Sequence, residues 1–166
     1  MAFSPYTLAG CQPIANTETT QKHPLGTIVR AVDPTYGEGE FIYALGVANT
    51  VVGLVARWNA TTYQTTLATE TDGATGVPVG IAMSANVASQ YGWYQISGLA
   101  VVKKITVAVT PGVAIYMTST AGRITSTLST GDQIVGARTA NLATVVTTTS
   151  TVVVSLNRPH IQGQPA

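Results

Sequence analysis

Short segments rich in Val, Ile, Thr and Tyr recur along most of this chain, and their spacing is the feature that most limits its fold. Gly, Pro, Asn or Asp residues bound these segments, as expected for strands separated by turns. About ten such strands at intervals of roughly 8–12 residues are typical of an all-β sandwich or barrel. The predicted strands are residues 25–32, 40–47, 51–58, 61–68, 77–84, 92–104, 113–118, 122–127, 133–139 and 143–156.

The two ends of the chain lack this pattern. Residues 1–24 contain three prolines and a polar tract, and residues 157–166 contain two prolines and a glycine. Segments without periodicity cannot bury a core of their own and are ordered only when something covers them. We therefore expect a β domain at residues 25–156 between an extended N-terminal arm and a C-terminal tail.

Two local signals refine the prediction for the β domain. Residues 83–90 are Ala-rich and form the best helical window, with Ser84 or Asn86 as a possible N-cap. Gly80 and Gly136 each interrupt a strand-like pattern, which usually marks a β-bulge or a close approach of another backbone. The sequence thus predicts one short helix and two irregular points in an otherwise regular set of strands.

Charged residues make up only 9% of the chain, and the formal net charge is +1, whereas a typical soluble domain has about 25% charged residues. So few Lys and Arg residues exclude a general nucleic-acid binder, and a hydrophobic content of 45% excludes a fully disordered chain. No apolar run reaches the about 18 residues of a transmembrane helix. A surface of Thr, Ser, Asn, Gln and Ala costs little to desolvate, so we expect packing against further copies or a larger assembly. A stable monomer with a Thr-rich surface is the alternative.

Residues suited to catalysis are few. His23 and His160 each lie beside a proline in an arm rather than in the β domain, and Cys11 is the single cysteine. A nucleophilic triad needs a rigidly held histidine, so we expect no enzyme, and we expect neither a cofactor nor a metal. Cys11 ends a lipoprotein-like LAGC sequence, but the residues before it lack the basic and apolar regions of a signal peptide. Lipidation is therefore not expected.

Three acidic residues, Asp33, Glu38 and Glu40, lie close together in the sequence. If they converged, they could bind Ca²⁺ or act as a pair of catalytic carboxylates. The simpler interpretations are that these residues form a turn or make salt bridges at an interface. Lys103 and Lys104 should point to opposite faces of a strand, with one of them pairing with an acid.

Aromatic residues are densest at Tyr91, Trp93 and Tyr94. The two-residue period of a strand places Tyr94 and Ile96 on one face and Gln95 on the other. Aromatic side chains stabilise both cores and protein interfaces. Whether Trp93 belongs to the core or to an interface is open at this point.

Several blocks of the sequence resemble head decoration proteins, also called cement proteins, of tailed bacteriophages. The blocks are residues 36–43 (YGEGEFIY), 46–48 (GVA), 84–98 (SANVASQYGWYQISG) and 131–138 (GDQIVGAR). The likeness extends over roughly residues 25–140 and is most specific in the 84–98 block. It implies a jelly-roll-like β-sandwich, with a small β-barrel or β-tulip as the alternative, and it brings no catalytic residues.

The same resemblance implies a structural virion protein, made in the host cytoplasm and bound to the outer surface of the capsid. Its partners would be the major capsid protein and further copies of the chain, as a dimer or a trimer, with no nucleic acid and no membrane. A phage tail or receptor-binding β module is the alternative. The candidate interface residues are Tyr36, Glu38, Glu40, Tyr91, Trp93 and Tyr94.

Overall fold

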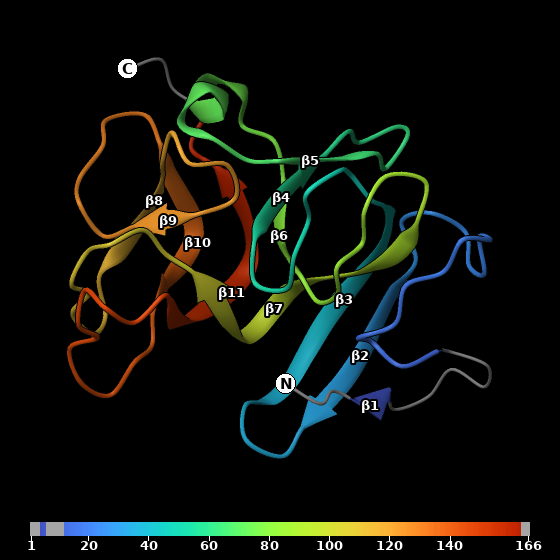
Figure 1. Ribbon diagram of the computed structural model, residues 1–166, viewed down its shortest axis with the longest axis horizontal. Helices are drawn as coiled ribbons and strands as arrows, with labels where there is room; N and C mark the ends of the chain where they lie inside the picture. Colours follow the sequence, from blue (N-terminus) through green and yellow to red (C-terminus); the bar gives the residue numbers. More distant parts are fainter. Residues whose placement is uncertain (1–3, 6–11, 164–166) are drawn as a thin grey trace.

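A computed structural model of the chain describes residues 4–5 and 12–163. It is almost entirely β, with 45% of residues in strands and 4% in a helix, which confirms the all-β class. The elements, labelled as in Figure 1, are β1 (Ser4–Pro5), β2 (Ile28–Asp33), β3 (Gly37–Leu45), β4 (Val55–Trp58), β5 (Thr65–Leu67), the 3₁₀-helix η1 (Glu70–Thr75), β6 (Val79–Ala82), β7 (Tyr91–Lys103), β8 (Ala114–Met117), β9 (Ile124–Thr125), β10 (Gln133–Thr139) and β11 (Thr151–Ile161).

Each of the ten predicted strands overlaps one observed strand, from β2 to β11. The predicted helix at residues 83–90 is wrong: this segment forms bends and turns between β6 and β7. An eight-residue Ala-rich window is too short to be a stable helix by itself. The helical turn lies instead at η1, where the Asp72 carboxylate pairs with Arg57 of β4 at 2.8 Å. Among the residues that the structure describes, no helix has the length and hydropathy of a membrane-spanning segment.

All the strands join one curled antiparallel sheet. Its main path runs β1-β2-β3-β7-β11-β10-β8-β9, and a branch of β6, β4 and β5 leaves it at β7. Figure 1 shows the β2–β3 hairpin on one side of the molecule, β8 to β11 on the other, and β7 running between them. The sheet is therefore divided into two halves that share one long strand.

Strand β7 is the branch point because different neighbours pair with successive parts of it. Gln95 pairs with both β3 and β6, and Ser97 pairs with both β3 and β11. One edge of β7 thus carries β3, and the opposite edge carries β6 followed by β11. Gly98 follows this exchange with a φ of +90°, and a Cβ atom there would lie 2.4 Å from the Glu38 carbonyl oxygen. Only glycine permits so close an approach of β3.

Both faces of β3 and of the first half of β7 are buried. On one face Phe41, Tyr43 and Trp93 belong to a cluster that we call the leader-side core, because Ile14 of the N-terminal arm, the leader of the chain, is part of it. On the other face Ile42 and Tyr94 belong to a cluster that we call the β4-side core, together with Ile96, as the strand period predicted. The leader-side core comprises Ile14, Val29, Ala31, Phe41, Tyr43, Met83 and Trp93. The β4-side core comprises Ile42, Ala44, Ala56, Trp58, Ala82, Tyr94 and Ile96.

A third and larger cluster fills the other half of the curled sheet. It takes buried aliphatic side chains from β4, β6, the second half of β7, β8, β9, β10 and β11, for example Val102, Ile115 and Val154. On β11, Val152, Val154 and Leu156 are buried at every second position. This alternation is the pattern of a strand with one face against the core.

The N-terminal arm is part of the fold in its described portion, so the prediction that residues 1–24 lie outside the domain is wrong there. Ile14 is 1% exposed within the leader-side core. Glu18 and Tyr91 exchange two backbone hydrogen bonds, of 2.9 and 2.7 Å, and β1 pairs with β2. Residues 1–3 and 6–11, and with them Cys11, lie outside the described residues.

The C-terminal boundary at residue 156 is also wrong. Strand β11 continues to Ile161, which is fully buried in the large core. His160 pairs with Val135 of β10 and forms a bridge with Pro78. The tail is held because its backbone completes the sheet, although its prolines and glycine hide the strand pattern.

Truncation of the Ile14 side chain tests the role of the arm. Ile14→Ala should lower the free energy of unfolding by about 2–5 kcal/mol, because it leaves a cavity against Phe41, Tyr43 and Trp93. Leu142→Ala is the control, since Leu142 is fully exposed and its truncation should change little. Urea unfolding followed by Trp fluorescence gives both values. Equal stability of the two variants would show that the arm is dispensable for the fold.

Candidate functional site

The structure separates the six candidate interface residues into three groups. Trp93 and Tyr94 are 0% exposed, so their assignment to an interface is wrong: each faces a core on its own side of β7. Tyr36 and Tyr91 are partly buried against the leader-side core. Glu38 reaches the surface and Glu40 lies just beneath it, and both belong to one charged group.

This group follows from the register of four neighbouring strands. Arg30 of β2 lies opposite Glu40 of β3, Glu40 lies opposite Ser97 of β7, and Ser97 lies opposite Asn157 of β11. Arg158 follows directly in β11. Side chains that lie opposite one another in antiparallel strands are close enough to interact. The sheet therefore places polar side chains in a row from β2 to β11.

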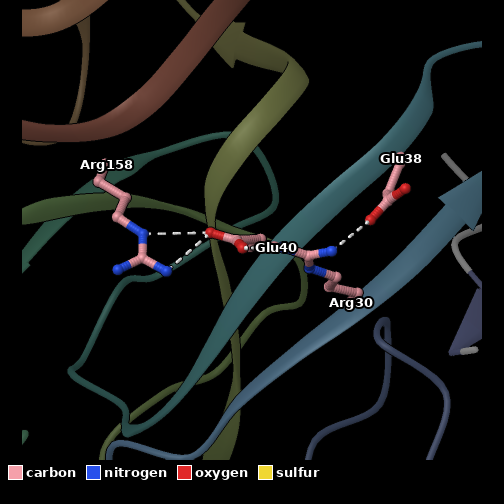
Figure 2. A network of polar contacts seen from close by, with 4 residues as sticks. All are labelled: Arg30, Glu38, Glu40 and Arg158. Carbon is pink, nitrogen blue, oxygen red and sulfur yellow. Dashed lines mark hydrogen bonds and ion pairs between the residues drawn. The ribbon is translucent and has the colours of Figure 1, made fainter. Parts of the chain in front are cut away.

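What we call the charged band consists of three residues of this row, Arg30, Glu40 and Arg158, and of Glu38, which lies two residues before Glu40 in β3 (Figure 2). Arg30 Nη2 lies 3.3 Å from Glu40 Oε1, and Arg30 Nη1 lies 3.5 Å from Glu38 Oε1. From the other side, Arg158 Nη2 and Nε both lie 3.2 Å from Glu40 Oε2. The Glu40 side chain is 16% exposed, whereas those of Arg30 and Arg158 are 65% and 63% exposed. Glu40 is thus the centre of the band, with one guanidinium on each oxygen.

Arg158 takes its place beside a β-bulge. The pairing of β10 with β11 shifts register between Val135 and Ala137, and Gly136 between them has a φ of +80°. A Cβ atom on Gly136 would lie 2.7 Å from the Asn157 carbonyl oxygen. Arg158 itself has a φ of +43°, which is uncommon for a residue other than glycine. Bulges redirect side chains, and the irregular point predicted at Gly136 is confirmed.

The band brings Glu38 and Glu40 together around Arg30, but Asp33 does not join them. Asp33 is used locally, because its Oδ1 accepts hydrogen bonds from the backbone N–H groups of Thr35 and Tyr36 in the β2–β3 turn. Within the described ranges, no three His, Cys, Asp or Glu residues lie together as metal ligands would. The convergence of Asp33, Glu38 and Glu40 is therefore not found. The hollow beside the band has a volume of about 400 Å³ and is lined by its two arginines and two glutamates.

The two histidines have different surroundings. The His23 ring lies 5.2 Å from the Tyr43 ring and 5.4 Å from the Trp93 ring, measured between centroids. Its Nε2 lies 2.7 Å from Gln12 Oε1. The expectation that His23 is outside the core and loosely held is thus wrong: it covers the edge of the leader-side core. His160 is exposed.

Tyr94 has a polar environment inside the β4-side core. Its hydroxyl accepts a hydrogen bond from Asn86 Nδ2 at 3.0 Å and lies 3.3 Å from Thr65 Oγ1. Burial raises the pKa of Tyr94 above its ordinary value of 10.0, and the hydrogen bonds to Thr65 and Asn86 oppose part of that effect. The segment at residues 84–90 therefore supplies a buried amide to the core instead of a helix.

The lysine pair also differs from the prediction. Lys104 is 1% exposed, and its Nζ donates hydrogen bonds to the carbonyl groups of Ile105, Val107 and Val146. Neither lysine forms an ion pair with any described carboxylate. Lys104 is thus a buried cation held by the backbone, and the expected pairing with an acid is wrong for the described residues.

Glu40 should contribute measurably to stability, but only modestly. Glu40→Gln should lower the free energy of unfolding by roughly 0.5–1 kcal/mol, because both arginine partners are largely solvated. The loss should shrink in 1 M NaCl, where screening is strong. Glu38→Gln is the matched control and should cost less, since Glu38 has one partner at 3.5 Å. Urea unfolding at low and high salt measures all four values, and a loss that salt leaves unchanged would contradict an ionic contribution.

Tyr94 should make the protein less stable in alkali. The unfolded chain loses the tyrosine proton near pH 10, whereas the folded protein keeps it to a higher pH. Stability from this group is therefore complete below pH 10 and decreases as pH rises through the folded pKa. Tyr94→Phe should flatten this part of the profile. Denaturant unfolding between pH 8 and 11.5 would reveal an incorrect assignment as parallel wild-type and Tyr94→Phe profiles.

Comparison of the chain with protein-family models, with curated proteins and with solved structures found no match. The resemblance to phage decoration proteins therefore stays a prediction, carried by the residue blocks that suggested it.

Proposed function

We propose that this protein is a structural virion component that binds the outer surface of an assembled tailed-phage head and stabilises the shell without catalysis. The observation that carries the proposal is the scarcity of charge at the surface. Charged residues are 9% of the chain, and in the charged band they neutralise one another within the chain. A surface of this kind loses little solvation free energy when another protein covers it.

The loops at one side of the molecule support the same proposal. Leu128 is 76% exposed, Leu142 is 102% exposed and Val146 is 57% exposed. They belong to the β9–β10 and β10–β11 connections, at the left of Figure 1. Threonines 144 and 147–149 are exposed in the same β10–β11 connection. Apolar and hydroxyl side chains together make a contact surface that carries no charge to repel a partner.

Repetition makes such a contact effective on a closed shell. A standard interface buries about 800 Å² on each partner, and a copy that contacts two capsid subunits gains from the high effective concentration of its second contact. The proposal includes the major capsid protein as partner and self-association as a dimer or trimer. Because few charges take part, binding should depend only weakly on salt.

The finer fold class belongs to the proposal as well. We infer a jelly-roll-like arrangement from the resemblance of residues 36–43 and 84–98 to decoration proteins. The curled sheet with its buried interior is compatible with that class and equally with the barrel-like alternative.

Removal of the protein from phage heads tests the function. Heads that lack it should release DNA at a lower temperature and resist osmotic shock less well than complete heads. Addition of the purified protein should restore both properties, with occupancy changing less than about threefold between 50 and 500 mM NaCl. DNA release followed by dye fluorescence gives the readout.

Heads that withstand heat and shock equally well without the protein would contradict the decoration role. A tail location with reduced adsorption to host cells would favour the receptor-binding alternative. The variant Leu142→Asp separates folding from binding. Its side chain is fully exposed, so the free domain should keep its Tm while occupancy of heads falls if this loop is at the interface. Val52→Asp, on the β3–β4 connection, is the matched control at a second exposed apolar position.

A further inference from the structure

A second hollow, of about 400 Å³, lies on the half of the molecule away from the charged band. Three connections meet there: the segment after β7, the β8–β9 turn and the β10–β11 loop. Lys104 and Arg123 both line it, and its other lining residues are Ile105 and hydroxyl-bearing residues, with no Asp or Glu among them. This hollow, which we call the basic pocket, therefore brings two cations together without a carboxylate.

The backbone holds both cations in place. Lys104 Nζ donates to the carbonyl groups of Val107 at 2.7 Å and Val146 at 3.1 Å, and the Lys104 N–H donates to the Ser150 carbonyl at 3.0 Å. Arg123 Nη1 donates to the carbonyl group of Lys104 at 3.0 Å. Lys104 thus fixes both ends of the loop at residues 146–150, and Arg123 is tied to Lys104. The pocket is formed in advance of any ligand, which lowers the entropic cost of binding.

The two cations are left without a counter-ion by the described part of the chain. Arg30, Arg57 and Arg158 each pair with a carboxylate, whereas Arg123 and Lys104 pair with none. A guanidinium has five N–H donors, and the bond to the Lys104 carbonyl uses one of them. Burial lowers the pKa of Lys104, since the ammonium has lost part of its hydration. The three N–H donors of Lys104 Nζ go to the carbonyl groups of Ile105, Val107 and Val146, so an anion in the pocket would bind Arg123 directly and would also compensate for the charge of Lys104.

We propose that the basic pocket binds an oxyanion, a phosphate or sulfate group, either free or carried by a small polar molecule. Arg123 supplies a planar pair of donors that suits two oxygens of one tetrahedral group. Hydroxyl groups of Thr120 and of the 147–150 loop line the same space and can donate to the remaining oxygens. The volume is in the range of small-molecule sites and exceeds the need of a single free ion. Thr147, Thr148 and Thr149 of this pocket also belong to the exposed loop that supports the proposed capsid contact, but anion binding to the free protein does not require the capsid.

Titration of the full-length protein with sodium phosphate and sodium sulfate tests the proposal. At millimolar concentrations, where the general stabilisation by excluded anions is small, both salts should raise the Tm in a saturable way beyond sodium chloride of equal ionic strength, because ligand bound only to the folded state stabilises it by mass action. Isothermal titration should give one site per chain. Glucose 6-phosphate, compared with inorganic phosphate and glucose, distinguishes a carried group from a free ion. Absence of any effect beyond that of chloride, with all three anionic probes, would overturn the proposal.

Variants locate the site. Arg123→Gln should weaken phosphate binding about tenfold or more, the effect of losing hydrogen bonds to a charged group. Arg138→Gln is the control, because Arg138 is exposed, forms no ion pair with a described carboxylate and lies outside the pocket. If Arg123→Gln fails to fold, the double variant Thr148→Val and Thr149→Val takes its place, with an unchanged Tm and weaker binding expected. Equal loss in Arg138→Gln, or unchanged binding in the pocket variants, would refute the assignment.

Discussion

Strand β7 must be buried on both faces while its backbone satisfies three neighbours, and most of the structure follows from that constraint. Trp93 and Tyr94 are adjacent residues, yet they fill separate cores because a strand alternates its side chains. The edges of β7 are shared by β3, β6 and β11. A buried backbone N–H or C=O without a partner costs free energy, so the branch of the sheet is possible only where β6 ends and β11 begins. The exchange takes place between Gln95 and Ser97.

The few charges of the protein are arranged by this exchange. Ser97 is the point where β3 and β11 lie on opposite edges of β7, so Glu40 and Arg158 meet although they are 118 residues apart in the sequence. The Glu40 side chain is only partly buried, with 16% of it exposed, and the two guanidinium groups compensate for the hydration that it loses. The band is thus a consequence of the sheet register.

Local patterns predicted the strands because alternation and turn residues are properties of neighbouring positions. They predicted that Tyr94 and Ile96 share a face and that Gly136 marks an irregular point, and both are confirmed. Burial of both faces of β7 could not be read in the same way, since it depends on Ile14 and on β4, which are distant in the sequence. Ile14 is the only large aliphatic residue in residues 9–24, and no periodic pattern near it indicates that it enters a core. The prediction that the arm lies outside the β domain is therefore wrong for a physical reason. The arm is held in place by tertiary contacts, and a local sequence pattern contains no information about them.

The same limit explains why Arg30 and Arg158 of the charged band, and the basic pocket as a site, were not predicted from the sequence. Glu38 and Glu40 stand out because acids cluster around them, but Arg30 and Arg158 are single residues in different strands. Lys104 and Arg123 are likewise separate, and only the return of β9 and of the 146–150 loop brings them together. The contrast between the two places is chemical. In the band each arginine has a carboxylate from the chain itself, so no ligand is required. In the basic pocket the chain supplies carbonyl and hydroxyl groups but no negative charge, and two cations held there by the backbone create a potential that an oxyanion is best able to neutralise.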